Sequence, residues 1–421
     1  MNEETPLMLN ASQQATKMRQ LSYLASTVCC FLSASFTVFS LYTNVFEFEL
    51  QYTPLQINYV SIAAEMGLYL CVPPLGYIAD AYRLSYVGIV GCVAYVVGYG
   101  GCAWVVYTHQ SWPLMALFFG IVGIGCSAAF IASLVNCARL FPETALLAIS
   151  MPTTLYGFSS LMYARVTSLY LESGKGLDSL FVELAVAMFV VGLLAVIAPV
   201  WGRVDVSAGP VGAQVSEEIP ENAESLVKRF FSDHKMLLFL LSFIFISGPL
   251  EMYQNDVGLI VKTSGGTTAQ VAHQVALFSG MSTVTRLSVG AIIDVCGVRP
   301  PYLLLGVVAV VCVTDFAYAQ GWLGLAVTSI VSGMGYGSAF TLYPLMVSQI
   351  WGIEGFATNW GMFILGPAIG LLLFGLKFGH DLEQSASVAS TFRLCAFVAL
   401  ISFVLVSQLK LHRAYDRLIS N

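Results

Sequence analysis

Six ionisable residues fall within or near the edges of long apolar stretches of this sequence, and the candidates among them are Glu65, Glu251 and Arg286. The other three are Arg165, Asp256 and Asp315. Insertion scales put an arginine, lysine or aspartate at the centre of a membrane-spanning helix at about 2.5–3.5 kcal/mol, so each such residue needs a function or a partner. Arg286 could bind a carboxylate through two parallel hydrogen bonds. Glu65 could exchange protons across a membrane. A structural ion pair for Arg286 and a hydrogen-bonded packing role for Glu65 remain the alternatives.

Polar residues recur around Arg286 at helical spacing. Ser279, Ser282, Thr283, Arg286 and Gly290 follow one another at intervals of three or four residues, which places them on one face of a helix. The rest of that stretch is apolar, so we expect this face to line a central cavity. Ser282 and Arg286 are therefore predicted to bind a solute.

A second group of candidates follows a helix breaker. Glu251 comes directly after Gly248-Pro249-Leu, and Asn255 lies one turn further on. Proline removes a backbone donor and kinks a helix, which suits a gating helix. We predict that Glu251 and Asn255 also face the cavity.

These residues are carried by a chain that is unusually apolar. Of 421 residues, 57% are hydrophobic and 10% are charged, whereas a soluble domain carries about 25% charged residues. Since a spanning helix needs roughly 20 apolar residues, we predict an all-α membrane protein with about twelve spans. The predicted spans are 21–46, 56–79, 84–107, 113–137, 145–170, 180–201, 236–253, 269–293, 302–320, 323–351, 356–378 and 389–409.

The spans divide into two six-helix bundles, 21–201 and 236–410, joined by a polar linker at 202–235. Most Lys and Arg residues then fall on the side that holds the linker and the tails, 1–20 and 411–421. The positive-inside rule places this side in the cytosol. The linker carries a cluster of glutamates and is predicted to be a tether with one short helix at 223–231.

An internal repeat supports the division. The pattern Gly-x-Ile-x-Asp occurs at 76–80 and again at 290–294, and Gly-x-Gly occurs at 123–125 and again at 333–335. Two matches in the same order and at nearly the same offset indicate duplication and pseudo-two-fold symmetry. Duplicated halves with a solute site between them are common in transporters.

The first repeat has a predicted role in the conformational cycle. Its glycine would let two helices approach closely, and its aspartate would pair with a following arginine in one conformation and release it in another. A plain salt bridge at the helix end is the alternative. The residues of the two predicted gating motifs are Gly76, Asp80, Arg83, Gly290, Asp294 and Arg299.

The stretch 76–83 resembles the signature of the major facilitator superfamily, and 290–299 resembles its second copy. Longer stretches resemble the fungal monocarboxylate-transporter homologues, at 55–67, 248–255, 335–340 and 351–361. This resemblance implies the major facilitator fold, transport, and location in the vacuolar membrane, with the plasma membrane as the alternative.

The sequence departs from the wider monocarboxylate-porter pattern. Ser282 stands where an Asp-x-x-x-Arg pair would have its aspartate, 141–144 lacks a basic cluster, and the first span lacks a lysine. These departures argue against proton-coupled transport of lactate or pyruvate.

Two functions are compatible with these features. The first is a secondary active or facilitative transporter of a small organic solute, such as a monocarboxylate-like anion, with protons as a second partner. The second is a non-transporting sensor or scaffold with a transporter-like fold. We expect a monomer in a lipid bilayer, with no catalytic set, no cofactor, no metal and no nucleic-acid partner. The ten cysteines are expected to be buried small hydrophobes.

Overall fold

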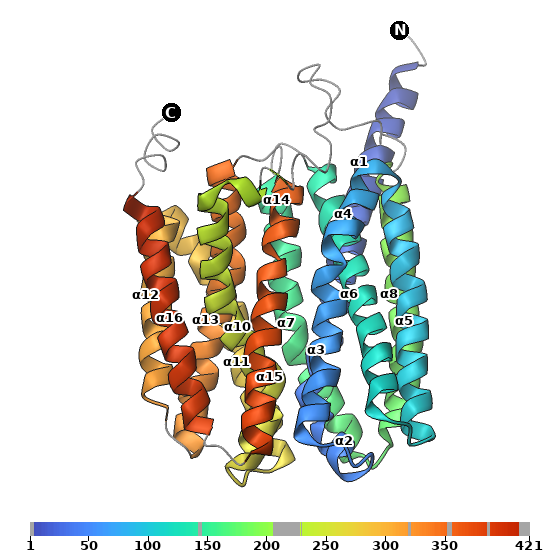
Figure 1. The fold of residues 1–421 in the computed structure, drawn as a ribbon. Helices are drawn as coiled ribbons and strands as arrows, with labels where there is room; N and C mark the ends of the chain where they lie inside the picture. Colours follow the sequence, from blue (N-terminus) through green and yellow to red (C-terminus); the bar gives the residue numbers. More distant parts are fainter. Residues whose placement is uncertain are drawn as a thin grey trace.

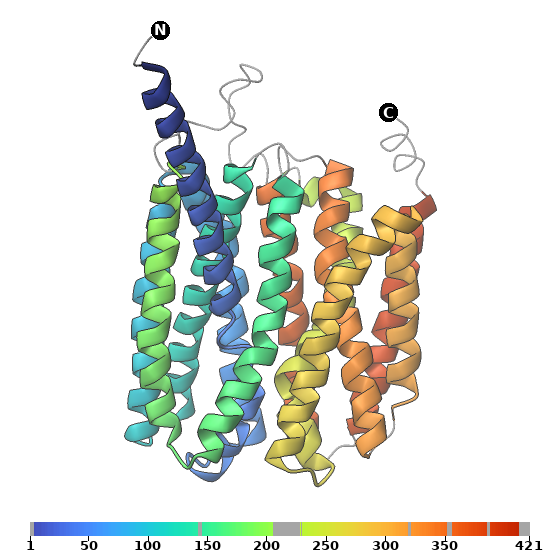
Figure 2. The ribbon, with the colours of Figure 1, turned by 180° about the vertical axis from the view of Figure 1, so that it is seen from behind.

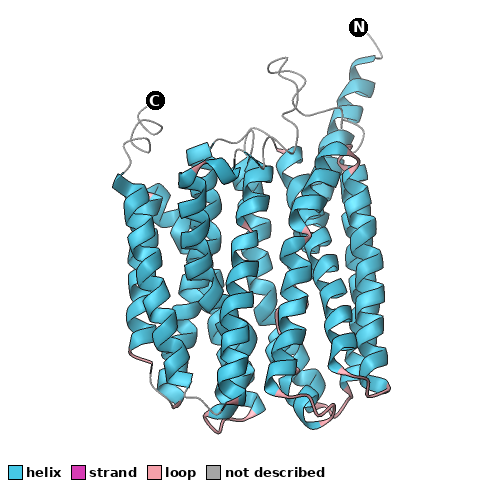
Figure 3. Cartoon of the chain, in the orientation of Figure 1, coloured by secondary structure: helices cyan, strands magenta, loops and turns pink. Residues whose placement is uncertain are grey.

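The computed structural model describes residues 4–141, 145–204, 228, 230–318, 321–351, 356–384 and 388–411. Throughout these ranges the chain forms helices joined by turns, and no strand is present in them (Figure 3). The start of α1 (Glu4–Ser33) and the end of α16 (Val388–Leu411) lie at the same end of the bundle (Figures 1 and 2). We call this end the termini side and the opposite end the far side.

The helices form two halves that lie side by side (Figure 1). The first half contains α1, η1 (Phe39–Leu41), α2 (Thr43–Phe48), α3 (Pro54–Leu70), α4 (Val72–Ala81), α5 (Leu84–Tyr107), α6 (Trp112–Leu140), α7 (Ala145–Glu172) and α8 (Leu177–Trp201). The second half contains α10 (His234–Thr263), α11 (Thr268–Cys296), α12 (Pro300–Phe316), α13 (Trp322–Trp351), α14 (Phe356–Phe363), α15 (Leu365–Glu383) and α16. Across the interface α7 packs against α11, and α3 packs against α15.

The apolar helices confirm an all-α membrane fold. In the described ranges, nine helical segments are long and apolar enough to cross a membrane, and the shorter α12 is also apolar. The helices α1 and α7 run through the same bundle beside them (Figure 2). The full count of twelve spans stays a prediction, and so do the domain boundaries, because most of the linker lies outside the described residues.

The first predicted span, 21–46, is not one helix. The helix α1 begins at Glu4 and ends at Ser33 in the middle of the bundle, and η1 and α2 follow after a turn. Hydroxyls of Ser33 and Thr37 donate to backbone carbonyls three residues earlier, which competes with helix continuation. The carbonyls of Leu32 and Ser33, exposed by the break, accept hydrogen bonds from Tyr163 (2.7 Å) and Tyr95 (3.0 Å).

Two further predicted spans are interrupted by proline. The second span breaks at Cys71 between α3 and α4, directly before Pro73-Pro74, and the eleventh breaks at Ile364 between α14 and α15, three residues before Pro367. The breaks are neighbours, because α4 packs against α14 and a Cβ at Gly361 would lie 3.8 Å from the Pro73 Cα. A pair of helix breaks, one in each half, therefore lies at the interface between the two halves.

The duplication is visible in the packing. A Cβ at Gly123 of α6 would lie 2.0 Å from the carbonyl oxygen of Ala64, and a Cβ at Gly333 of α13 would lie 2.2 Å from that of Phe278. Ala64 and Phe278 are separated by the same offset as the two Gly-x-Ile-x-Asp motifs. Each half is thus built around the same close helix contact, in which only glycine fits.

The glycines of the Gly-x-Ile-x-Asp motif do not behave as predicted. No described atom lies within 4 Å of a Cβ built on Gly76 or Gly290. The expected close helix approach at this motif is therefore wrong, and the approach occurs at Gly123 and Gly333 instead. The cysteine expectation also has an exception, because Cys296 is exposed while seven of the ten thiols are buried.

Candidate functional site

A small cavity lies between the two halves, about midway along the bundle. Its volume is ≈ 10 Å³, which is room for about one water molecule. The first half contributes Thr37, Tyr156, Gly157 and Ser160 to its wall, and the second half contributes Gln254, Phe278, Ser279, Ser282, Arg286 and Tyr336. The cavity therefore contains the predicted polar face of α11, including the candidate residues Ser282 and Arg286.

Arg286 enters the cavity without a charged partner. It forms no ion pair with any described acidic residue, and its buried Nε has no hydrogen-bond partner. Its guanidinium carbon lies 5.8 Å from the ring centroid of Tyr336 and 5.9 Å from that of Phe340. Across the interface, a Cβ at Gly157 would lie 3.2 Å from Nε. The aromatic rings attract the cation by cation–π interaction, and they provide no acceptor for its Nε–H.

Three hydrogen-bonded residue pairs join α3 to α10 across the interface. Asn58 donates to both carboxylate oxygens of Asp256 (3.0 Å each), Asn255 donates to Glu65 (3.4 Å), and the Tyr69 hydroxyl donates to Glu251. All six side chains are buried. The three residues of α3 share one helical face. Their partners on α10 follow in the opposite sequence order, because α10 runs antiparallel to α3. The structure thus brings Glu65, Glu251 and Asn255 together, beside the cavity rather than in its lining.

Some buried polar atoms of these α3–α10 pairs have no hydrogen-bond partner among the described residues. Glu65 Oε2, Glu251 Oε2 and Asn58 Oδ1 are buried and have no hydrogen-bond partner in the described part of the chain. A buried polar atom without a partner costs about 1–3 kcal/mol. The interface therefore favours binding of something that supplies donors to these oxygens.

The far side of the interface is closed. Lys262 of α10 forms an ion pair with Glu47 of α2, and the Thr53 hydroxyl donates to Glu383 at 2.8 Å. A Cβ at Gly258 would lie 2.5 Å from the carbonyl oxygen of Ser40. These contacts separate the cavity from the far side, because each of them joins the first half to the second.

The profile of the Major Facilitator Superfamily matches residues 23–358. The chain belongs to the major facilitator superfamily. Its relatives include the "Probable transporter MCH1" of Wickerhamomyces anomalus, 30% identical over 407 residues that cover 90% of this chain and 83% of the relative. The protein of the same name in Yarrowia lipolytica is 30% identical and covers 87% and 84%, and that in Saccharomyces cerevisiae is 26% identical and covers 95% and 94%.

These similarities confirm the predicted family, that of the fungal monocarboxylate-transporter homologues. With the helical membrane fold, they show that this protein of the superfamily is a membrane transporter of small solutes.

The predicted gating motifs of this superfamily member stay predictions. The side chains of Asp80 and Asp294 lie outside the described residues, while Arg83 and Arg299 are exposed. Sequence reasoning missed Arg139, whose guanidinium donates to the Ala79 carbonyl at 2.8 Å and ties α6 to the end of the motif helix.

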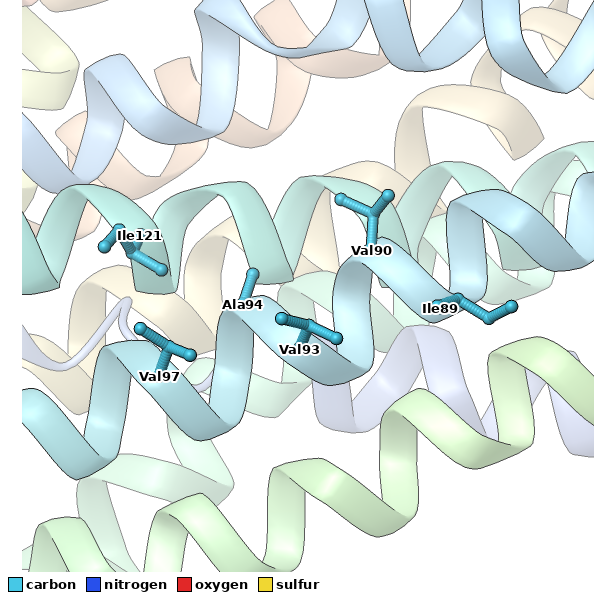
Figure 4. A pocket seen from close by; sticks show the side chains of 6 residues that line it. All are labelled: Ile89, Val90, Val93, Ala94, Val97 and Ile121. Atoms are coloured by element: carbon cyan, nitrogen blue, oxygen red, sulfur yellow. The ribbon is translucent and has the colours of Figure 1, made fainter.

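A larger groove of about 370 Å³ lies on the outer surface of α5 and α6 (Figure 4). Among the described residues, its lining consists of the aliphatic side chains of Ile89, Val90, Val93, Ala94, Val97 and Ile121. In a superfamily transporter, such a surface faces lipid. It offers no polar group to a solute, so the smaller cavity at Arg286 is the candidate site.

Proposed function

We propose that this transporter carries, by alternating access, a small organic solute with a carboxylate or similar anionic group, and that Arg286 binds this group. One observation carries the proposal: Arg286 lies in a cavity between the two halves, and its buried Nε has no hydrogen-bond partner in the described part of the chain. A guanidinium recognises a carboxylate through paired, charge-assisted hydrogen bonds. The hydroxyl-bearing residues Ser279, Ser282 and Ser160 in the wall would add further donors.

We infer that protons are the second partner. Glu65, Glu251 and Asp256 are buried in the span region and form no ion pair with a described base. A carboxylate in this position is strongly disfavoured unless it is neutralised. Protonation of Glu65 or Glu251 would also supply a donor to a region rich in unpartnered oxygens. Uptake is therefore expected to depend on the pH gradient.

The proposal places the protein, as a monomer, in the vacuolar membrane with both termini in the cytosol. The orientation is supported by the excess of basic residues in the loops on the termini side. Lys175, Lys262, Lys377 and Arg393 are the bases on the far side. A tagged protein that co-localises with a vacuolar-membrane marker would agree with this, and one confined to the plasma membrane would refute it.

The central test uses purified protein in liposomes with a panel of labelled carboxylates and both gradient directions. Removing one partner of a buried, hydrogen-bonded charge pair costs about 2–5 kcal/mol, so Arg286→Gln should lower anion uptake by roughly 30-fold or more. Arg286→Lys should recover only part of it, because lysine lacks the paired donors. Arg165→Gln is the matched control, because Arg165 is exposed. Normal uptake by Arg286→Gln would remove Arg286 from the site.

A further inference from the structure

We infer that the solute is a zwitterion that carries both a carboxylate and an ammonium group, as an α-amino acid does. This inference rests on the proposed function, since it assumes that Arg286 binds the carboxylate. It adds that Glu251, with Glu65 beside it, binds the ammonium. Two kinds of unsatisfied atom lie in this region of the interface.

The unsatisfied atoms are of opposite polarity. Arg286 offers a buried donor without an acceptor, and Glu251 and Glu65 each offer a buried oxygen without a donor. An anion would satisfy the arginine and leave both carboxyl groups unsatisfied. A cation would do the reverse. A solute with both charges satisfies both sets, and each set is expensive to leave unpaired.

The two sets are close to one another but do not pair. Arg286 and Glu251 lie within electrostatic range, and both lie within range of Tyr69 and Tyr336. Arg286 nevertheless forms no ion pair within 4.0 Å with a described carboxylate. Opposite charges that lie near each other without pairing are complementary to the two charged groups of a small zwitterion. The interface must open to admit the solute, because the cavity between the halves has room for about one water molecule.

The helices explain why the two groups stay apart. The Tyr69 hydroxyl of α3 donates to Glu251 and holds this carboxyl group toward the first half. Tyr336 and Phe340 of α13 hold the guanidinium toward the second half. Each charge is therefore held in place by its own neighbours before a solute arrives, and such pre-organisation lowers the cost of binding.

Glu65 gives the site its second acidic group. Asn255, one turn from Glu251 on α10, donates to Glu65 at 3.4 Å, so the two carboxyl groups lie on the same stretch of the interface. In the proposed site one of them pairs with the ammonium while the other holds a proton, because two like charges disfavour each other. In the empty, closed interface a proton takes the place of the ammonium. Entry of the solute would then displace a proton, which couples the two fluxes in opposite directions.

The test compares matched solutes on the full-length protein in liposomes. Labelled α-amino acids with small, aliphatic, aromatic and acidic side chains are offered one at a time. The competitors are the 2-hydroxy acid with the same side chain, which lacks the ammonium, and the amino-acid methyl ester, which lacks the carboxylate. We expect uptake of at least one amino acid, with at least tenfold weaker competition by its hydroxy acid and its ester.

Variants separate the two halves of the argument. Glu251→Gln should lower uptake of the amino acid more than uptake of its hydroxy acid and so reduce the preference, whereas Arg286→Gln should lower the uptake of both. Glu65→Gln serves as the second variant if Glu251→Gln fails to fold. Glu172→Gln is the matched control, because Glu172 lies at the far-side end of α7.

The outcomes distinguish the two proposals. Equal or better uptake of the hydroxy acids would overturn the zwitterion inference and leave the anion site of the proposed function standing. An unchanged preference in both Glu251→Gln and Glu65→Gln would also overturn it. If the protein took up neither amino acids nor hydroxy acids, and no other carboxylate, both the zwitterion inference and the anion site would be overturned.

Discussion

Gly258 should control closure of the far side. It lies on α10, where a Cβ would stand 2.5 Å from the Ser40 carbonyl oxygen and 3.0 Å from the Thr43 hydroxyl oxygen. An ordinary close contact between carbon and oxygen is about 3.3 Å or longer, so in Gly258→Ala the helices must separate by roughly 0.8 Å. Because Ser40 and Gly258 belong to different halves, this separation opposes closure between the halves rather than folding within one.

The size of the effect follows from the overlap. Forcing an extra methyl group into a packed contact costs about 1–3 kcal/mol, which corresponds to a roughly 5- to 150-fold shift of a two-state equilibrium. We therefore expect Gly258→Ala to favour the far-side-open state by this factor. Solute uptake should fall as well, because each transport cycle must pass through the closed state.

The assay measures closure through a pair of engineered cysteines. The Thr53 hydroxyl and the Glu383 carboxylate are 2.8 Å apart across the far side. In a Cys296→Ser background, which removes the exposed thiol, Thr53→Cys and Glu383→Cys should be joined rapidly by a short bifunctional thiol reagent. Adding Gly258→Ala should slow this cross-linking by roughly 5- to 150-fold, the expected shift of the equilibrium away from the closed state.

The matched control is Gly280→Ala on α11, where no described atom lies within 4 Å of the new Cβ. Both variants gain the same helix propensity, up to about 1 kcal/mol, so their difference isolates the contact with Ser40. The reasoning would be refuted if folded Gly258→Ala cross-linked and transported as fast as Gly280→Ala.

Further predictions concern packing, protonation and the broken helix. Gly123→Ala should destabilise the protein by about 2 kcal/mol or more, because the new Cβ overlaps the Ala64 carbonyl oxygen. Gly76→Ala should be near neutral, because no described atom lies within 4 Å of its new Cβ. Thermal unfolding in detergent compares the two variants, and equal melting temperatures would contradict this expectation. Asp256→Asn keeps the shape of its contact with α3 but cannot titrate, so uptake should depend less on pH than in the native protein. A pH profile identical to the native one would exclude Asp256 from proton coupling. Tyr163→Phe should cost about 0.5–1.5 kcal/mol, since it removes one hydrogen bond to the end of α1; chemical denaturation of the variant measures this.

The fold was predictable because hydropathy and duplication can both be recognised from short stretches of the sequence. Long apolar stretches predict spans, and the repeated Gly-x-Gly pattern coincides with contacts that only glycine permits. The close helix approach expected at Gly76 is not found for a physical reason. A glycine in the sequence shows where close approach is possible, whereas the approach itself depends on the partner helix.

The site was predictable in part. Arg286 and Ser282 follow from the polar face of α11, and the structure places both in the cavity wall. The pairing of α3 with α10 was not predictable, since it depends on how two halves meet. Tyr336 and Tyr156 were missed because aromatic residues are abundant here, and nothing local separates those that line the cavity from those that pack.

The matching glycine contacts at Gly123 and Gly333 have a consequence for how such proteins diversify. Each contact is internal to its own half, whereas Glu65, Glu251 and Arg286 project between the halves. Stability and selectivity are therefore carried by different surfaces of the same helices. A gene copy could exchange its interface side chains and acquire a new cargo while the scaffold of each half stays intact.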